Sequence, residues 1–267
     1  MAKPLIFVTN DDGITAPGIR ALIAAMNELG EVVVVAPDSV HSGKSHAVTI
    51  HQPLYLDAIK IDDGPQKEYK TNGMPVDAVK LGLAHAVQRR PDLLVSGLNH
   101  GVNNSVNVLY SGTMGAALEG AIEGIPSIGF SLDNYDWQAD LEPAKHYMKK
   151  IVRQVLQDGL PQGIALNVNI PYLPLNEIKG IKVARQAQDK WHENYDKRTN
   201  PFGRDYYWLN GNFSYEDKGT DTDVFALKNG YVSVVPVQYD LTAHHLINHL
   251  KNLEQQTYNE VSKPIKR

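Results

Sequence analysis

The chain of 267 residues contains no cysteine, which excludes disulfides, thiolate nucleophiles, cysteine-ligated zinc and iron–sulfur clusters. It also lacks any apolar run long enough to cross a membrane. The first apolar run, residues 5–8, is too short for the core of a signal peptide. We therefore expect a soluble, cytoplasmic protein with no membrane partner.

An excess of positive charge is absent as well. Lys and Arg number 26 against 30 Asp and Glu, which gives a net charge of −4. Generic binding of nucleic acid or anionic lipid needs a concentrated positive field, so no stable nucleic-acid partner is expected. Glycine (21) and proline (15) are close to ordinary levels, and 42% of residues are hydrophobic. This composition excludes collagen-like and wholly disordered chains and is sufficient for a full core.

Short apolar runs alternate with segments of helical spacing. The first three segments predict a strand over 5–8, a helix over 16–26 and a buried strand over 32–36, which together form a βαβ unit. Further helices are predicted over 74–87, 112–123, 141–155 and 243–253, and further strands over 93–96, 127–130, 164–170 and 231–237. The pattern predicts an α/β fold with a doubly wound, mostly parallel sheet.

No linker interrupts this pattern. We expect one domain over 1–267, in which residues 1–135 form the core with its site loops and residues 136–267 continue the sheet. In open parallel sheets, ligands bind outside the carboxyl ends of the strands. The loops that follow the strands at 5–8, 32–36 and 93–96 are therefore the places to search.

The first of these loops contains Asn10, Asp11, Asp12 and Gly13 where a dinucleotide-binding sheet has a glycine-rich turn. Two adjacent carboxylates would repel phosphate, but a divalent cation such as Mg²⁺ or Mn²⁺ held by Asp11 and Asp12 would attract it. The alternative is that Asp12 and Gly13 form a simple turn and Asp11 caps a helix.

The other two loops are also polar. Ser42 offers a hydroxyl to a metal or phosphate, His46 a proton, and Asn99 a carbonyl oxygen or an amide N–H. The alternative is an ordinary polar surface loop. The triplet Gly43-Lys44-Ser45 is not a P-loop, because Asp38 stands where that motif requires glycine.

Ser111, Gly112 and Thr113 open the helix predicted over 112–123. The start of this helix is a candidate anion-binding site, because it offers free amides, two hydroxyls and the positive end of the helix dipole. The alternative is that these residues simply cap the helix. His245 and His249 share a helix face, but without a glutamate between them they do not form a metalloprotease motif.

Eight aromatic residues occur within residues 191–215. Stacking on single-stranded nucleic acid is one interpretation, but residues 185–218 contain six basic and six acidic groups and so form no cationic track. A subunit-contact arm or a lid over the site is the interpretation that we favour, and an ordinary surface loop is the third.

Several motifs together resemble the SurE family, the survival protein E type of 5′/3′-nucleotidase, nearly end to end. The matching motifs are Val8-Thr9-Asn10-Asp11-Asp12-Gly13-Ile14, Val35-Ala36-Pro37-Asp38 with Ser42 and His46, Ser96-Gly97-Leu98-Asn99, Tyr110-Ser111-Gly112-Thr113, Pro201-Phe202-Gly203-Arg204 and Gly230-Tyr231-Val232-Ser233. Two positions depart from the common pattern, Val102 where many members have proline and Asn107 where many have an acidic residue.

The resemblance implies a three-layer α/β/α Rossmann-like fold, with a hairpin arm and a C-terminal extension that build a homodimer or homotetramer. It implies a phosphatase that uses one divalent cation per subunit to hydrolyse nucleoside 5′- and also 3′-monophosphates, with Mg²⁺ or Mn²⁺ in the cell and Ca²⁺ as an alternative in crystals. The implied metal ligands are Asp11, Asp12, Ser42 and Asn99.

The candidate catalytic and phosphate-binding residues follow from the loops and the resemblance together. We assign catalysis to Asp11, Asp12 and His46, with an aspartate as the base for the attacking water. Phosphate contacts are assigned to Asn10, Ser42, Asn99, Ser111, Gly112 and Thr113. Two other functions remain open: a haloacid-dehalogenase-type phosphatase, whose aspartyl nucleophile would stand at Asn10, and a non-catalytic, metal-dependent nucleotide-binding regulator.

Overall fold

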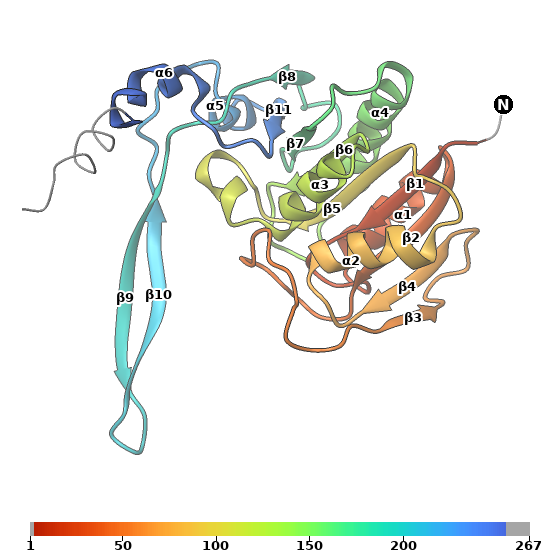
Figure 1. Cartoon of the computed structure of the whole chain (residues 1–267), viewed down its shortest axis with the longest axis horizontal. Helices are drawn as coiled ribbons and strands as arrows, with labels where there is room; N and C mark the ends of the chain where they lie inside the picture. Colours follow the sequence, from red (N-terminus) through yellow and green to blue (C-terminus); the bar gives the residue numbers. More distant parts are fainter. Residues whose placement is uncertain (1–2, 255–267) are drawn as a thin grey trace, which may run out of the picture.

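A nine-stranded sheet forms the centre of the computed structural model, which describes residues 3–254 (Figure 1). The strand order is β3-β4-β2-β1-β5-β6-β7-β11-β8. The strands are β1 (Leu5–Thr9), β2 (Glu31–Pro37), β3 (Leu56–Ile59), β4 (Lys67–Thr71), β5 (Leu93–His100), β6 (Ser127–Leu132), β7 (Ile164–Ile170), β8 (Ile181–Val183) and β11 (Val232–Gln238). The six strands from β4 to β7 in this order are parallel, and β3 and β11 pair antiparallel to β4 and β7.

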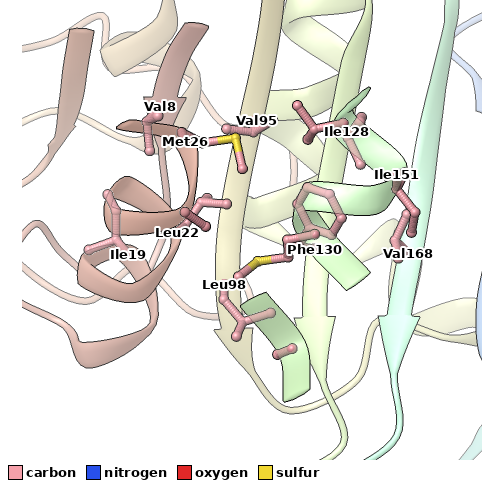
Figure 2. Close-up of a cluster of buried hydrophobic side chains, with 14 of the residues drawn as sticks. Val8, Ile19, Leu22, Met26, Val95, Leu98, Ile128, Phe130, Ile151 and Val168 are labelled. Atoms are coloured by element: carbon pink, nitrogen blue, oxygen red, sulfur yellow. The ribbon is translucent and has the colours of Figure 1, made fainter. Parts of the chain in front are cut away.

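Helices cover both faces of the sheet. In β1, Ile6 and Val8 pack in one apolar cluster with α1 (Pro17–Asn27) and α4 (Glu142–Asp158), whereas Leu5 and Phe7 pack in another with α2 (Pro75–Leu81). Helix α3 (Gly112–Ile122) packs beside α2. Figure 2 shows the first cluster, in which side chains of α1 meet those of β5 and β6. The alternation along β1 thus produces three layers, which confirms the predicted α/β/α fold.

The order of the strands places the polar loops together. The chain runs from β1 outward to β2 on one side and later returns to β5 on the other side of β1, so the direction of winding reverses at β1. Such a reversal leaves a crevice at the carboxyl ends of the strands. At Gly18 in the first turn of α1, a Cβ would lie 2.0 Å from the Leu98 carbonyl oxygen, so a side chain at this position would separate α1 from β5.

Some predicted elements differ from the observed ones. Strands β3, β4 and β8 and the helix α5 (Asp223–Lys228) were not predicted. The helix predicted over 74–87 ends as α-helix at Leu81 and continues as a π-helical turn, η1 (Gly82–Ala86). A Cβ on Gly82 would lie 2.4 Å from the Phe7 ring, so this turn packs directly on the strand.

The C-terminal part of the described chain is less regular than the predicted helix over 243–253. It forms a 3₁₀ turn, η3 (His244–Leu246), followed by α6 (Ile247–Leu250). Another short 3₁₀ helix, η2 (Ser105–Leu109), precedes α3. The part of the expected C-terminal extension beyond residue 254 lies outside the described residues. No helix within residues 3–254 is long and apolar enough to span a membrane.

The aromatic stretch folds as an antiparallel hairpin of β9 (Trp191–Thr199) and β10 (Asp205–Phe213). The hairpin extends away from the body of the molecule (Figure 1). Every residue of β9 is exposed, and Trp208 and Leu209 of β10 are more than 60% exposed. The arm that the resemblance implied is therefore present as a structural element.

Candidate functional site

Five of the predicted site residues line one cavity of about 410 Å³ at the carboxyl ends of β1, β2 and β5. They are Asp11, Asp12, Ser42, Asn99 and Ser111. Each comes from a loop or strand end that the sequence singled out, and Ser111 is the N-cap of α3. The topology thus brings together side chains that are up to 100 residues apart in the sequence.

Backbone hydrogen bonds join the first two loops. The Ile14 N–H donates to the Pro37 carbonyl at 2.8 Å, and the His41 N–H donates to the Asp11 carbonyl at 2.7 Å. Asn10 is 1% exposed, and its Nδ2 donates to the Gly13 carbonyl at 2.9 Å, across a turn in which Gly13 has a φ of +94°. These contacts fix the direction in which Asp11 and Asp12 leave β1.

Asp11 is buried against the start of α3. Its side chain accepts a 2.5 Å hydrogen bond at Oδ1 from the Thr113 hydroxyl. A Cβ on Gly112 would lie 2.8 Å from the Asp11 Cβ, so a side chain there would displace the carboxylate. The pKa of Asp11 is raised to about 6. Burial is the main cause, the Thr113 hydrogen bond acts in the opposite direction, and the neighbouring Asp12 charge adds to the increase. Asp11 is therefore a carboxylate whose charge is poorly compensated by the protein alone.

The oxygens of Asp12 and Asn99 complete the polar end of the cavity. Asp12 is 9% exposed, and its Oδ2 lies 3.4 Å from the His100 backbone nitrogen. Asn99 donates from Nδ2 to the Gly101 carbonyl at 2.7 Å. This hydrogen bond fixes the amide, so that its carbonyl oxygen remains as an acceptor.

The chemistry of these donors fits a hard divalent cation. Two carboxylates, one hydroxyl and one amide carbonyl are the oxygen ligands that Mg²⁺ and Mn²⁺ prefer. Two neighbouring buried carboxylates are also unfavourable unless a cation compensates them. Residues 3–254 contain no group of three or more His, Cys, Asp or Glu that could hold a metal. A cation here would therefore depend on Ser42 and Asn99 in addition to the aspartates.

The remaining predicted residues lie around this cavity rather than on its surface. Thr113 and Gly112 support Asp11, and Asn10 lies within the first loop. His46 lines a neighbouring hollow of about 720 Å³, where its Nε2 lies 2.7 Å from Glu119 Oε2. Lys80 contacts the other oxygen of Glu119 at 2.5 Å. The structure thus places His46 beside Glu119 of α3, which also contacts Lys80 of α2, outside the cavity.

The chain matches the family model described as Survival protein SurE over residues 6–193. It belongs to the SurE family. It is 58% identical to a protein named 5′-nucleotidase SurE from Flavobacterium psychrophilum, over 94% of this chain and 98% of that protein. It is 59% identical to the protein of the same name from Flavobacterium johnsoniae, over 93% and 96% of the two chains.

A solved SurE structure shares the fold. The crystal structure of a SurE protein from Aquifex aeolicus is 41% identical to this chain and superposes with a TM-score of 0.81, covering 94% of this chain and 100% of that one. The likeness extends over nearly the whole chain, including the part beyond residue 193. The resemblance that the sequence motifs indicated is thereby confirmed.

The SurE cavity in this chain also contains residues that the sequence reasoning missed. Its aromatic lining comes from Tyr110, Tyr135, Trp137 and Trp191. Tyr135 and Trp137 follow β6, so the rule that pointed to the other strand ends would have found their loop too. No local pattern places Trp191 here, because it belongs to the base of the hairpin.

The two positions that depart from the common SurE pattern lie at this site. Val102 lines the cavity, and Asn107 lines it as well. The Trp191 ring N–H donates to Asn107 Oδ1 at 2.7 Å. An uncharged side chain at 107 therefore links the base of the hairpin to the rim of the cavity.

Proposed function

We propose that this chain is a divalent-metal-dependent phosphatase that hydrolyses nucleoside 5′-monophosphates, and 3′-monophosphates as second substrates, to nucleoside and phosphate. The observation that carries this proposal is a single cavity with a buried, oxygen-rich acidic end and an aromatic wall. The names of the Flavobacterium relatives support a 5′-nucleotidase.

One Mg²⁺ or Mn²⁺ ion would be held by Asp11, Asp12, Ser42 and Asn99. When bound, such an ion supplies positive charge that attracts the phosphate and stabilises the charge of the transition state. The proposed base is an aspartate of this pair, which accepts a proton from the attacking water. The water oxygen bonds to phosphorus as the ester P–O bond breaks. The leaving nucleoside oxygen takes up a proton from solvent, and the aspartate returns to solvent the proton that it accepted from the water.

The start of α3 suits the phosphate. Ser111 accepts the Met114 N–H at Oγ, so its own hydroxyl hydrogen is free to donate to a phosphoryl oxygen. Free N–H groups of the first turn and the positive end of the helix dipole add to this attraction. Thr113 donates to Asp11, so its role is to hold the aspartate.

The aromatic wall suits the nucleoside. Tyr110, Tyr135 and Trp191 are each at least 40% exposed and line the same cavity as the aspartates. Aromatic side chains stack on any nucleobase, because every base has a π-face. Such a wall suits nucleoside monophosphates as a class rather than one particular nucleotide.

The deciding experiment compares Asp12→Asn with Asp63→Asn. The first variant removes a proposed ligand charge with little change in shape, and we expect kcat/KM for nucleoside 5′-monophosphates to fall about 10²- to 10³-fold at saturating Mn²⁺. Asp63 is 97% exposed, lies in the loop between β3 and β4 and does not line the cavity, so its variant should retain wild-type activity.

Phosphate release would be measured over a panel of 5′- and 3′-monophosphates with Mg²⁺, Mn²⁺ and Ca²⁺. Wild-type activity in Asp12→Asn would overturn the proposal. Tight nucleotide binding without phosphate release by the wild type would instead indicate a non-catalytic binding protein. A trapped phospho-aspartate would indicate haloacid-dehalogenase chemistry, although Asn10 occupies that position and is engaged with Gly13.

We also propose that the protein works as a homodimer or homotetramer. The support is the hairpin, because a two-stranded hairpin alone is marginally stable in water and this one exposes large aromatic side chains. A second copy of the chain is the partner that would cover them.

A further inference from the structure

His100 is a buried histidine at the end of β5 that the sequence reasoning did not assign. Its side chain is 2% exposed, and within the described residues neither ring nitrogen has a hydrogen-bond partner. Buried polar atoms in native proteins normally have a partner, whether protein, water or ion. The position of this ring therefore calls for an explanation.

The ring lies beside one of the proposed metal ligands. His100 Nδ1 is 3.8 Å from Asp12 Oδ2, and the His100 backbone nitrogen is 3.4 Å from the same oxygen. Two nitrogens of one residue, the backbone N and the ring Nδ1, thus face one carboxylate oxygen. The residue also lines the cavity that contains Asp11 and Asn99.

Neighbours on two sides restrict the ring. The Trp137 ring stacks on it with a centroid separation of 6.0 Å and an interplanar angle of 30°. From α1, Gly18 approaches so closely that a Cβ there would lie 3.2 Å from His100 Cε1. These two contacts leave the imidazole little room to turn towards water. The charged side chain beside it is Asp12.

We infer that His100 is a positioning residue whose Nδ1–H donates to Asp12 Oδ2 and holds that carboxylate in place for the cation. This inference rests on the proposed metal-dependent function. A charge-assisted N–H···O bond is about 2.8 Å long, so an approach of roughly 1 Å completes it. Hydrogen bonds to ligating groups orient the ligand, and their loss typically weakens metal affinity about 10- to 100-fold.

The test uses two variants that offer an N–H in different places. His100→Asn puts an amide nitrogen near the position of Nδ1, whereas His100→Gln puts one near the position of Nε2. Mn²⁺ affinity of the metal-free protein would be measured from the free-ion EPR signal, and Mg²⁺ affinity by competition. We expect about 10- to 100-fold weaker binding of both ions in His100→Gln and a change below about threefold in His100→Asn.

Kinetics add a second readout. Because the proposed role is to hold a ligand, His100→Gln should raise the metal concentration needed for half-maximal activity while kcat at saturating metal stays close to wild type. A kcat loss that excess metal does not restore would overturn the inference. So would equal affinity losses in the two variants, which would indicate packing against Trp137 rather than a hydrogen bond.

Direct ligation by the ring is a distinct outcome. Imidazole is a better ligand for Mn²⁺ than for Mg²⁺. A loss of Mn²⁺ affinity much larger than the loss of Mg²⁺ affinity would therefore overturn the positioning role in favour of ligation. Thermal unfolding of each variant shows whether it is folded under the conditions of the titration.

One measurement needs no variant. In the wild-type protein with Mg²⁺, the ring ¹⁵N shifts of His100 should report the Nδ1–H tautomer, and the Nε2–H tautomer would overturn the inference. Asp12→Asn serves to separate the two proposals. If the wild type and Asp12→Asn bind Mn²⁺ equally, the proposed metal site fails as a whole; if only Asp12→Asn is impaired and His100→Gln is not, the role of His100 alone fails.

Discussion

Thr113 illustrates how a single hydroxyl can control the acidic end of the cavity. It donates to Asp11 Oδ1 at 2.5 Å and is itself fully buried. Thr113→Val keeps the shape but removes the donor, so the Asp11 carboxylate loses a stabilising contact in a buried site. We predict about 10-fold weaker Mn²⁺ binding at constant pH, measured by titration calorimetry.

The matched control for this prediction is Thr113→Ser, which retains the hydroxyl and loses only a methyl group. It should bind Mn²⁺ within about threefold of wild type. If Thr113→Val and Thr113→Ser bind the ion equally well, the hydrogen bond to Asp11 is not important for the site.

At this scale the sequence predicted the residues with distinctive chemistry and missed those defined by tertiary contact. Asp11, Asp12 and Ser42 could be found because each follows a strand at the same edge of the sheet. Asn99 could be found because it comes soon after the predicted strand over 93–96, although β5 continues to His100 and contains Asn99 near its end. His100 follows Asn99 directly, yet its meaning depends on contacts with Asp12 and Trp137 that no local pattern contains.

A buried ion pair connects two elements, α1 and β4. Arg20 donates from Nη1 and Nη2 to the two oxygens of Glu68, at 2.7 and 2.8 Å. Glu68 is 4% exposed. Burial by itself would raise the pKa of Glu68, but the Arg20 hydrogen bonds prevail and hold this pKa below its ordinary value of 4.5.

The same pair explains why β4 was missed. Its sequence, Lys67 to Thr71, is mostly charged and polar and has no apolar alternation. The strand pairs with β2 and β3 on its two sides, and its buried Glu68 has a cationic partner on α1. Partners in other elements cannot be read from five residues. In contrast, β1 and β2 have continuous apolar runs and were predicted correctly in type and position.

Removing the carboxylate with Glu68→Gln should lower the free energy of unfolding by about 3 kcal/mol at pH 7, because Arg20 loses its buried partner. The folded-state pKa of Glu68 is depressed, so its contribution is present above pH 4.5 and is lost as the pH falls through the lower folded value. The difference between wild type and variant should therefore shrink in acid, as followed by urea denaturation from pH 7 to pH 3.

Asp62→Asn is the control for this ion pair. Asp62 also contacts Arg20, at 2.6 Å, but its side chain is 55% exposed. An exposed partner contributes little, so we expect a loss below about 1 kcal/mol. Equal effects of Glu68→Gln and Asp62→Asn would contradict the view that burial makes the Glu68 contact important.

On the scale of the whole molecule, the hairpin is the element that does not pack into the central sheet. It forms its own two-stranded sheet, and Phe202 at its tip is 94% exposed. Its base is different, because Trp191 packs edge-on against Phe213 and lines the cavity. The base therefore belongs to the site, whereas the distal part exposes the apolar surface that the proposed second copy of the chain would cover.

Replacing residues 195–209 with a two-residue Asn-Gly turn tests this division. Asn194 and Asn210 are paired in the hairpin, so a tight turn can join them without disturbing Trp191. We predict a species of smaller mass by size exclusion with light scattering, with the thermal unfolding of the body preserved. Trp208→Ala, which removes one exposed ring from the distal hairpin, should weaken the assembly partially and make it concentration-dependent. An unchanged mass for the shortened protein would show that the distal hairpin is not the contact between subunits.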